Sequence, residues 1–446
     1  MKVAFHTLGC KVNQYETESL KMKFKNKGYQ LVEEDDVADI YVINTCTVTG
    51  LADRKSRQYI RRMKKKNPDS VMAVTGCYAQ IDPEKVKSIQ GVDLVAGTNE
   101  KNNLVEYIEN YLITGDKQVY VHPYEKLTQY EETGTITSME SRTRAYIKIQ
   151  EGCNRFCTYC VIPYARGQVR SRKPEEILKE AKMLIDNGFK ELILTGINAA
   201  LYGQEPDFSL SDDLKTITGI HGIEVIIKML NDLEGDFRIR LSSLEPTVIK
   251  KENVKRLLAY KRLCPHLHLS IQSGSDNILK TMNRNYTVEE YLDIVKMLKD
   301  HDPEYGITTD LIVGFPGESE EDFQDSLAII RKSGFCKVHG FKYSKRPKTK
   351  AADMQGQISP DIKKQRGEAL AETSEEVACK FFTQNIGKIR KVLFEEYVHG
   401  ESLITGYTDN YIKVYVENNK DTDINQFAQV RLGRLFQDGM MGEIVI

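Results

Sequence analysis

Three closely spaced cysteines constrain this chain more than any other feature. Residues 151–166 read EGCNRFCTYCVIPYAR and place Cys153, Cys157 and Cys160 in a C-x3-C-x2-C spacing. Three thiolates on one short loop can hold three corners of a four-iron cluster, which leaves the fourth iron free to bind another molecule. Zinc normally takes four closed ligands, and no fourth Cys or His lies near this loop in the sequence. The loop therefore predicts an open iron–sulfur site.

Composition bears on whether such a site can persist. The chain has 446 residues, nine cysteines and a formal net charge of −1. No apolar run reaches the roughly 18 residues that cross a membrane. The N-terminal MKVAFHTLGC turns polar too soon for a signal peptide. We therefore expect a cytoplasmic protein without membrane contact, whose thiols stay reduced rather than forming disulfides.

A second set of cysteines follows three predicted strands in the N-terminal part, residues 1–113. The strands are expected at 3–8, 39–44 and 71–75, with helical patterns at 16–27 and 54–66 and after Pro83. Apolar strands that alternate with helices indicate a parallel sheet. Cys10, Cys46 and Cys77 come directly after the strands, so they should converge where the carboxyl ends share one edge. A lone cysteine is usually a buried hydrophobe, but three at equivalent positions predict a second cluster.

The middle of the chain, residues 144–380, repeats strand then helix. Six strands are expected at 145–150, 191–194, 238–241, 267–271, 308–313 and 338–343. Helices are expected at 174–187, 213–233, 248–260, 288–299 and 320–332. This α/β alternation fits a partial (β/α)6 barrel related to the TIM barrel, whose ligands bind at the carboxyl ends of the strands. Gly, Ser, Gln and Glu at those ends suit ligand binding, although each alone also fits ordinary turn chemistry.

Two further segments complete the predicted organisation. Residues 114–143 lack a helical period and predict a connector with room for one strand at 119–122. A linking helix is expected at 361–380. Residues 381–446 then carry five short strand patterns, at 389–394, 403–407, 412–416, 427–432 and 442–446, which predict a small β-barrel.

By its motifs the chain resembles the methylthiotransferases, which are radical S-adenosylmethionine (SAM) enzymes with an N-terminal cluster domain, a partial barrel and a C-terminal TRAM domain. The motifs are TLGCKVNQYETE, NTCTVT, EGCNRFCTYCVIPYARG, LSSLEP, QSGS, MNR and DLIVGFPGE. They cover essentially the whole chain. LGCKVNQYE most resembles the branch that acts on N6-threonylcarbamoyladenosine at position 37 of tRNA. The alternatives are the branches that act on isopentenyladenosine or on a small-subunit ribosomal protein.

The resemblance implies two [4Fe-4S] clusters and SAM as cofactors. The SAM-binding cluster would be held by Cys153, Cys157 and Cys160, and the auxiliary cluster by Cys10, Cys46 and Cys77. The implied SAM contacts are Tyr159, Thr195, Gly196, Ser243, Glu245, Gln272, Ile312 and Gly314. The chain departs from the family pattern at residues 199–201, which read AAL, and at Lys348, where glycine is more usual. The implied partners are a tRNA anticodon stem-loop, an electron donor of the flavodoxin or ferredoxin type, and a sulfur donor.

A basic run after Cys46 bears on the RNA partner. Residues 54–66 hold eight lysines and arginines, and the nearest acidic residue is Asp53. Such a run is ordinarily a solvated helix face, but its lack of acids favours an RNA phosphate track that includes Arg57, Arg61 and Arg62. RNA binding by the C-terminal barrel rests on the resemblance alone. The competing class is a non-catalytic iron–sulfur RNA-binding protein or redox sensor, against which the SAM-like barrel motifs argue.

Overall fold

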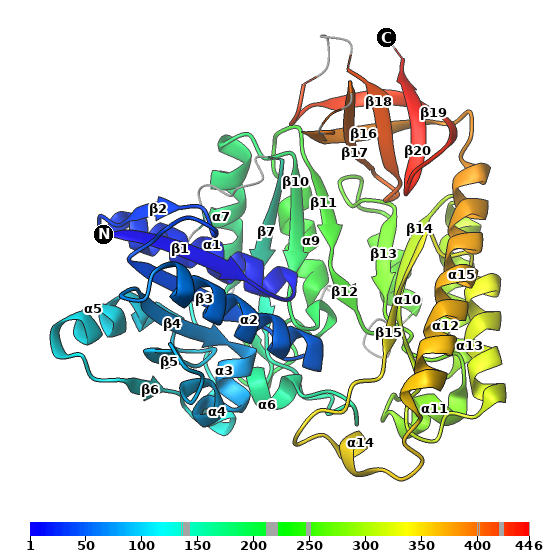
Figure 1. The fold of residues 1–446 in the computed structure, drawn as a ribbon. Helices are drawn as coiled ribbons and strands as arrows, with labels where there is room; N and C mark the ends of the chain where they lie inside the picture. The colour runs from blue at the N-terminus through cyan, green and yellow to red at the C-terminus, as the bar shows by residue number, and fades with distance from the viewer. Residues whose placement is uncertain are drawn as a thin grey trace.

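The computed structural model describes residues 1–134, 136, 143–210, 222–246, 251–398, 400, 402–418 and 423–445. An N-terminal α/β sheet lies beside a central partial barrel, and a small C-terminal closed barrel caps one end of the central barrel (Figure 1). Within these residues no helix is long and apolar enough to cross a bilayer.

The N-terminal part is a six-stranded parallel sheet in the order β2-β1-β3-β4-β5-β6. Its strands are β1 (Lys2–Thr7), β2 (Gln30–Val32), β3 (Ile40–Thr45), β4 (Val71–Gly76), β5 (Leu94–Ala96) and β6 (Gln118–Tyr120). Its helices are α1 (Lys11–Asn26), α2 (Gly50–Lys66), α3 (Cys77–Ile81), α4 (Pro83–Lys87) and α5 (Leu104–Thr114). Separate apolar clusters cover the two faces, with Tyr41 in one and Val42 in the other. This burial on both sides explains why β3 and β4 are apolar throughout.

The predicted parallel sheet is confirmed, but the sequence pattern missed parts of it. β2 and β5 have three residues each, which is too short for a recognisable period. β6 falls inside the predicted connector, close to the strand allowed at 119–122. Helix α1 begins at Lys11 rather than at residue 16, because the chain turns directly from Cys10 into the helix.

The central barrel has six main parallel strands, as predicted. They are β7 (Arg144–Lys148), β10 (Glu191–Thr195), β11 (Arg238–Leu241), β13 (His266–Leu269), β14 (Gly306–Val313) and β15 (Lys337–Lys342). The short strand β12 (Ser243–Leu244) continues β11 past Ser242 and pairs with β13. β11 pairs with β10 on its other side, so this broken strand connects the two halves of the barrel. A two-stranded ladder, β8 (Gln150–Glu151) and β9 (Arg170–Ser171), flanks the cysteine loop.

Helices cover the outside of this barrel (Figure 1). They are α7 (Pro174–Asp186), α9 (Ile223–Asn231), α10 (Lys251–Leu257), α12 (Val288–His301) and α13 (Glu320–Ser333). Shorter helices connect the strands: α6 (Ile162–Arg166), α11 (Asp276–Thr281), α14 (Lys350–Asp353) and the 3-10 turns η1 (Lys101–Asn103), η2 (Tyr124–Lys126) and η3 (Ala199–Leu201). Parts of two predicted helices, residues 213–221 and 248–250, lie outside the described residues, as do 135 and 137–142 of the predicted connector.

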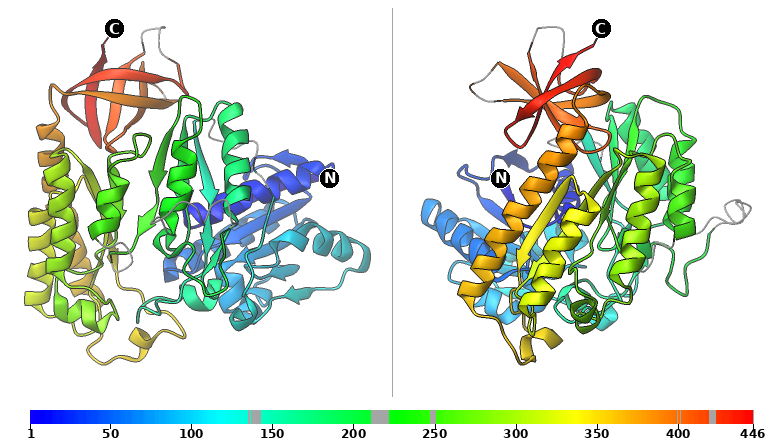
Figure 2. Two further views of the ribbon diagram at one scale, coloured as in Figure 1. Left: turned by 180° about the vertical axis from the view of Figure 1, so that it is seen from behind. Right: turned by 90° about the vertical axis from the view of Figure 1, so that its right-hand side faces the viewer.

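The long helix α15 (Pro360–Gln384) runs along the barrel and leads to the C-terminal part (Figure 2). There, five strands close into the predicted small barrel, consistent with a TRAM domain. They are β16 (Ile389–Tyr397), β17 (Leu403–Thr408), β18 (Lys413–Glu417), β19 (Phe427–Phe436) and β20 (Gly439–Ile444); Ile446, at the end of the fifth predicted strand, lies outside the described residues. Arg238 donates to the Tyr407 carbonyl (3.0 Å) and Arg240 to the Asp409 carbonyl (3.0 Å). The small barrel therefore closes the amino end of the central barrel and leaves the carboxyl end for ligands.

Candidate functional site

Cys10, Cys46 and Cys77 meet at the carboxyl edge of the N-terminal sheet. They follow β1, β3 and β4, which are neighbours in the sheet. The glycines before two of them, Gly9 (φ 115°) and Gly76 (φ 96°), adopt backbone conformations that side chains disfavour. A Cβ on Gly9 would lie only 2.9 Å from the Cβ of Cys46. The convergence expected from the sequence is thus present, and glycine lets the chains approach closely.

Cys153, Cys157 and Cys160 lie on the loop between β8 and α6, beyond the carboxyl end of β7. Burial raises the pKa of Cys153 to about 12, and the nearby Cys157 adds to the rise. Burial also raises the pKa of Cys160, to which both other cysteines contribute. Among the three cysteines at the edge of the N-terminal sheet, burial and, secondly, the nearby Cys77 raise the pKa of Cys46 to about 12. These thiols keep their protons at neutral pH unless a metal displaces them.

Each set of thiols has one buried arginine beside it. Nε of Arg166 donates to Sγ of Cys77 (3.3 Å), and a terminal nitrogen of Arg284 donates to Sγ of Cys157 (3.5 Å). A buried guanidinium stabilises a thiolate, and with it an anionic cluster. In the described part of the chain, no three His, Cys, Asp or Glu side chains could hold a single metal ion directly. A four-iron cluster is larger than a single ion and is held by cysteine thiolates, so the chemistry of both donor sets suits such a cluster.

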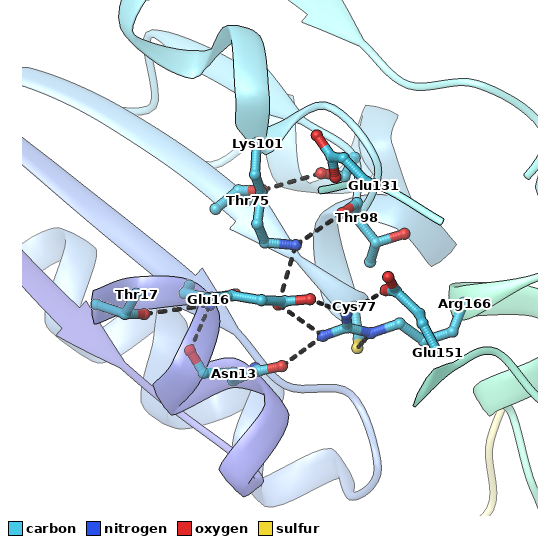
Figure 3. Close-up of polar contacts among 12 residues, drawn as sticks. Asn13, Glu16, Thr17, Thr75, Cys77, Thr98, Lys101, Glu131, Glu151 and Arg166 are labelled. Atoms are coloured by element: carbon cyan, nitrogen blue, oxygen red, sulfur yellow. Dashed lines mark hydrogen bonds and ion pairs between the residues drawn. The ribbon is translucent and has the colours of Figure 1, made fainter. Parts of the chain in front are cut away.

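A buried network of charges fixes the two thiol sets relative to each other (Figure 3). Arg166 binds Glu16 of α1 and Glu151 of the cysteine loop, the latter at 2.7 Å. Lys101 lies 3.2 Å from Glu16, and Lys148 lies 3.3 Å from Glu16 and 3.1 Å from Glu151. Burial alone would raise the pKa of Glu16, but Arg166, Lys101 and Lys148 together lower it to about 2. Glu16 is therefore ionised at neutral pH and fastens α1 to the barrel.

Three adjoining hollows connect the surface to both thiol sets. A groove of about 830 Å³ beside α1 shares Gln14 and Tyr146 with a cavity of about 470 Å³ in the barrel. That cavity shares Asp310 with a smaller pocket of about 200 Å³. Cys10 lines the cavity, and Cys160 lines the pocket. One cysteine of each set therefore borders this row of adjoining hollows.

Most of the predicted SAM contacts divide between the two inner hollows. The small pocket is lined by Tyr159, Gln272 and Ile312, and the cavity by Thr195, Gly196 and Ser243. Gln272 has a φ of 71°, a strained conformation that occurs at ligand sites. Tyr159 packs beside Ile312 in one apolar cluster, which suits a flat adenine ring.

The other two predicted SAM contacts are placed differently. Glu245 accepts from Asn198 Nδ2 (2.7 Å) and pairs with Arg155 (3.3 Å) and Arg284 (3.4 Å), so it braces the cysteine loop. Gly314 turns towards α15, where an added Cβ would lie 2.3 Å from Cγ of Lys363. Neither residue lines the three hollows.

The departure from the family pattern at Lys348 has a local explanation. Its φ is 67°, in the left-handed region where glycine carries no steric cost. The Lys348 ammonium reaches the Ile81 carbonyl of the N-terminal part at 3.4 Å. Lys348 thus adds a contact between domains that glycine could not make. The other departure from the family pattern, at residues 199–201, forms the buried turn η3.

Several residues that shape this site were not predicted from the sequence. Gln150 accepts from the Asn198 backbone (3.0 Å) and donates to the Gly152 carbonyl (2.7 Å), which holds the cysteine loop against the strand ends. Lys11 lines the cavity; burial, then Arg240 and Arg144, lower its pKa to about 8, so it is mostly protonated at neutral pH. Arg166 and Arg284 lie within recognised motifs, and their position there was the available signal.

The basic helix α2 is less open than its sequence suggests. Arg62 pairs with Asp35 at 2.5 Å, and Arg57 donates to the Tyr78 hydroxyl at 3.3 Å. Arg61 is exposed and makes no hydrogen bond or ion pair among the described residues. Of the three arginines proposed for RNA contact, Asp35 neutralises Arg62 and the Tyr78 hydroxyl holds Arg57 without neutralising it, so within the described residues Arg61 is the one with no polar partner.

Known protein families match the N-terminal part and the central barrel of this chain separately. Residues 147–330 match the radical SAM superfamily, and residues 2–97 match a family described as uncharacterized protein family UPF0004. A solved structure of the radical SAM methyltransferase TsrM from Kitasatospora setae, with tryptophan and a SAM analogue bound, superimposes with a TM-score of 0.57. It covers 79% of this chain and 75% of TsrM at 13% identity, and so shows a shared fold.

Curated relatives match along nearly the whole chain. The threonylcarbamoyladenosine tRNA methylthiotransferase MtaB of Bacillus subtilis is 41% identical over 99% of this chain and 97% of that protein. The protein of the same name from Aquifex aeolicus is 42% identical over 94% and 98%. The tRNA-2-methylthio-N(6)-dimethylallyladenosine synthase of Caldicellulosiruptor saccharolyticus is 34% identical over 98% and 91%.

Proposed function

Because this chain belongs to the radical SAM methylthiotransferase family, we propose that it adds a methylthio group to C2 of N6-threonylcarbamoyladenosine at position 37 of tRNA. The observation that carries the proposal is the pair of adjoining hollows that Cys10 and Cys160 border. The substrate assignment is supported by 37–42% identity to four relatives named for threonylcarbamoyladenosine, against 34–36% to four named for dimethylallyladenosine.

Radical SAM enzymes use a [4Fe-4S] cluster and SAM, and we assign that cluster to Cys153, Cys157 and Cys160 and a second to Cys10, Cys46 and Cys77. When bound, these groups supply one-electron cleavage of SAM and the transfer of sulfur and a methyl group. No side-chain base could start this reaction, because the adenine C2–H is not acidic. The chain's own task is therefore to bind, orient and exclude water.

The described residues suit that task. Arg166 and Arg284 stabilise thiolates at the two sets. Tyr159 and Ile312 offer apolar surface to an adenine ring, while Thr195 and Ser243 offer hydroxyls to the polar remainder of SAM. The ion network around Glu16 holds the N-terminal sheet against the barrel, so the distance between the two sets is fixed before substrate binds.

We further propose that the tRNA anticodon stem-loop contacts helix α2 through Arg61. Arg61→Ala should weaken RNA binding and reduce the slope of log affinity against log salt by about one unit, as expected for one lost phosphate contact. Arg62→Ala is the matched control and should have a smaller effect, because Asp35 already neutralises Arg62. Filter binding over a range of salt concentrations measures both. Equal slopes for wild type and Arg61→Ala would make α2 an ordinary solvated face.

The remaining partners follow from the reaction. An electron donor of the flavodoxin or ferredoxin type must reduce the cluster, and a sulfur donor must replace the sulfur that leaves with each product. We place the enzyme in the cytoplasm with its tRNA substrate.

Nucleoside mass spectrometry of tRNA tests the proposed function. A strain that lacks the gene should contain N6-threonylcarbamoyladenosine but not its 2-methylthio derivative, and the gene should restore the derivative. Loss of the methylthio form of dimethylallyladenosine instead would show that the substrate assignment is wrong. No change in either nucleoside, with a changed mass of a ribosomal protein, would move the enzyme to a protein substrate.

A further inference from the structure

The cavity of about 470 Å³ has a polar wall to which the proposed clusters and SAM contacts give no role. Five side chains from three neighbouring strands form it: His266 and His268 from β13, Thr308 and Asp310 from β14, and His339 from β15. Nδ1 of His268 lies 2.9 Å from Oγ1 of Thr308, and its Nε2 lies 3.2 Å from Oδ2 of Asp310. The wall therefore presents hydrogen-bond donors and acceptors rather than an apolar surface.

Two buried polar atoms, one in this wall and one elsewhere in the lining of the cavity, have no hydrogen-bond partner among the described residues. They are Nδ1 of His266, a side chain 3% exposed, and Oγ of Ser242, a residue 5% exposed. Buried polar atoms in folded proteins are nearly always hydrogen-bonded, because leaving one unpaired is costly. Such atoms in the wall of a cavity point to a polar ligand that completes them.

Lys11 adds a positive charge to the same cavity. The two arginines closest to it electrostatically are already neutralised: Arg240 pairs with Glu191 at 2.9 Å, and Arg144 with Glu395 at 2.6 Å. Lys11 has no hydrogen bond or ion pair within the described part of the chain. Glu191 and Asp310 raise the pKa of Lys11, but Glu191 pairs with Arg240 and Asp310 lies 3.2 Å from His268, so neither carboxylate forms an ion pair with Lys11. A partly buried ammonium without a direct ion pair can bind a further anion.

We propose that this cavity receives the N6 substituent of the target adenosine and that the Lys11 ammonium binds the carboxylate of its threonylcarbamoyl group. This inference rests on the proposed function and names the residue that selects the substrate. The substituent carries a carboxylate, a hydroxyl and a urea-type linkage. It thus offers an anion to Lys11 and both donors and acceptors to Ser242 and the histidine wall.

The same wall would reject a dimethylallyl substituent. That group has only carbon and hydrogen, so it would leave Lys11 and the buried polar atoms without partners. Sites built to hydrogen-bond a substrate discriminate strongly against analogues that lack the bonding groups. The cavity is also of ordinary ligand-site size, within the roughly 300–1,000 Å³ that is typical.

The surface groove provides the way in. Its lining is mixed in charge, with Arg144, Lys21 and Lys25 beside Glu18, Glu33 and Glu34, and it shares Gln14 and Tyr146 with the cavity. A nucleotide turned out of an RNA loop could pass from this groove into the cavity. Its base would then lie near Cys10 while its N6 substituent reaches the histidine wall.

Binding of three RNAs tests the inference on the enzyme with its clusters reconstituted. The RNAs are anticodon stem-loops of one sequence that carry adenosine, N6-threonylcarbamoyladenosine or N6-dimethylallyladenosine at position 37. Wild type should prefer the threonylcarbamoyl RNA, and Lys11→Met should lower its affinity for that RNA alone by about 10- to 100-fold, as for one lost charge-assisted hydrogen bond. Lys11→Arg should restore much of the preference. Lys27→Met, at the far end of the same helix, is the matched control and should retain it fully.

Iron content and SAM affinity separate this role from the neighbouring Cys10. Both should equal wild type in Lys11→Met and in Lys11→Gln, the second neutral variant. The inference is overturned if Lys11→Met keeps the wild-type preference, weakens all three RNAs equally, or lowers only SAM affinity. It is also overturned if both neutral variants lose iron while Lys11→Arg keeps it. A wild type that methylthiolates only the dimethylallyl RNA would instead refute the proposed function itself.

Discussion

Replacing Cys153, Cys157 and Cys160 together with alanine should abolish reductive cleavage of SAM. On our assignment these thiols hold the SAM-binding cluster, so the triple variant should lose about half of the iron and form no 5′-deoxyadenosine. Iron and sulfide analysis after anaerobic reconstitution, with chromatography of the SAM products under dithionite, measures both effects.

The control for this variant is Cys379→Ala. Cys379 is a partly exposed cysteine of α15 that belongs to neither set, so its loss should leave iron content and SAM cleavage unchanged. A triple variant that kept both clusters and still made 5′-deoxyadenosine would show that the assignment of this loop is wrong.

Replacing Cys10, Cys46 and Cys77 with alanine should separate the two halves of the reaction. We expect this variant to cleave SAM reductively but to form no methylthio product on tRNA. The cysteine loop has its own supports within the barrel: Thr158 donates to the Met282 carbonyl at 3.0 Å, and Arg284 still reaches Cys157. The radical half needs this loop and an electron, not the N-terminal thiols.

The ion network around Arg166 links the two cluster sites, so this second prediction also tests whether they function independently. Arg166 contacts Cys77 and also holds Glu151 of the cysteine loop, so losing one cluster could disturb the other site. Cys77→Ala alone is a useful comparison, because it removes the sulfur that Arg166 contacts and leaves Cys10 and Cys46. Methylthiolated tRNA made by the variant without Cys10, Cys46 and Cys77 would refute the auxiliary role of these three cysteines. If this variant folds and retains the cluster of the barrel but no longer cleaves SAM, the two cluster sites do not function independently.

Sequence alone determined the placement of the six cysteines. Cys153, Cys157 and Cys160 are held together by local spacing. For Cys10, Cys46 and Cys77 a topological rule was enough, because each follows a strand and parallel strands end at one edge. The cysteine loop carries Tyr159, and Thr195 ends a strand near the same site, since a barrel gathers its strand ends whatever its loops do.

Tertiary structure alone decided which charges are available and what the hollows contain. Arg57 and Arg62 belong to the same basic run as Arg61. Only the fold shows that Arg57 donates a hydrogen bond to Tyr78 and that Arg62 forms an ion pair with Asp35. It likewise turned Gly314 away from the hollows, and it placed Lys11 opposite a wall of histidines from strands more than 250 residues away. The physical reason is that ion pairing and cavity lining depend on distances between residues remote in sequence. Periodicity and spacing report only local geometry, so no local pattern could distinguish a paired arginine or an enclosed lysine from an exposed one.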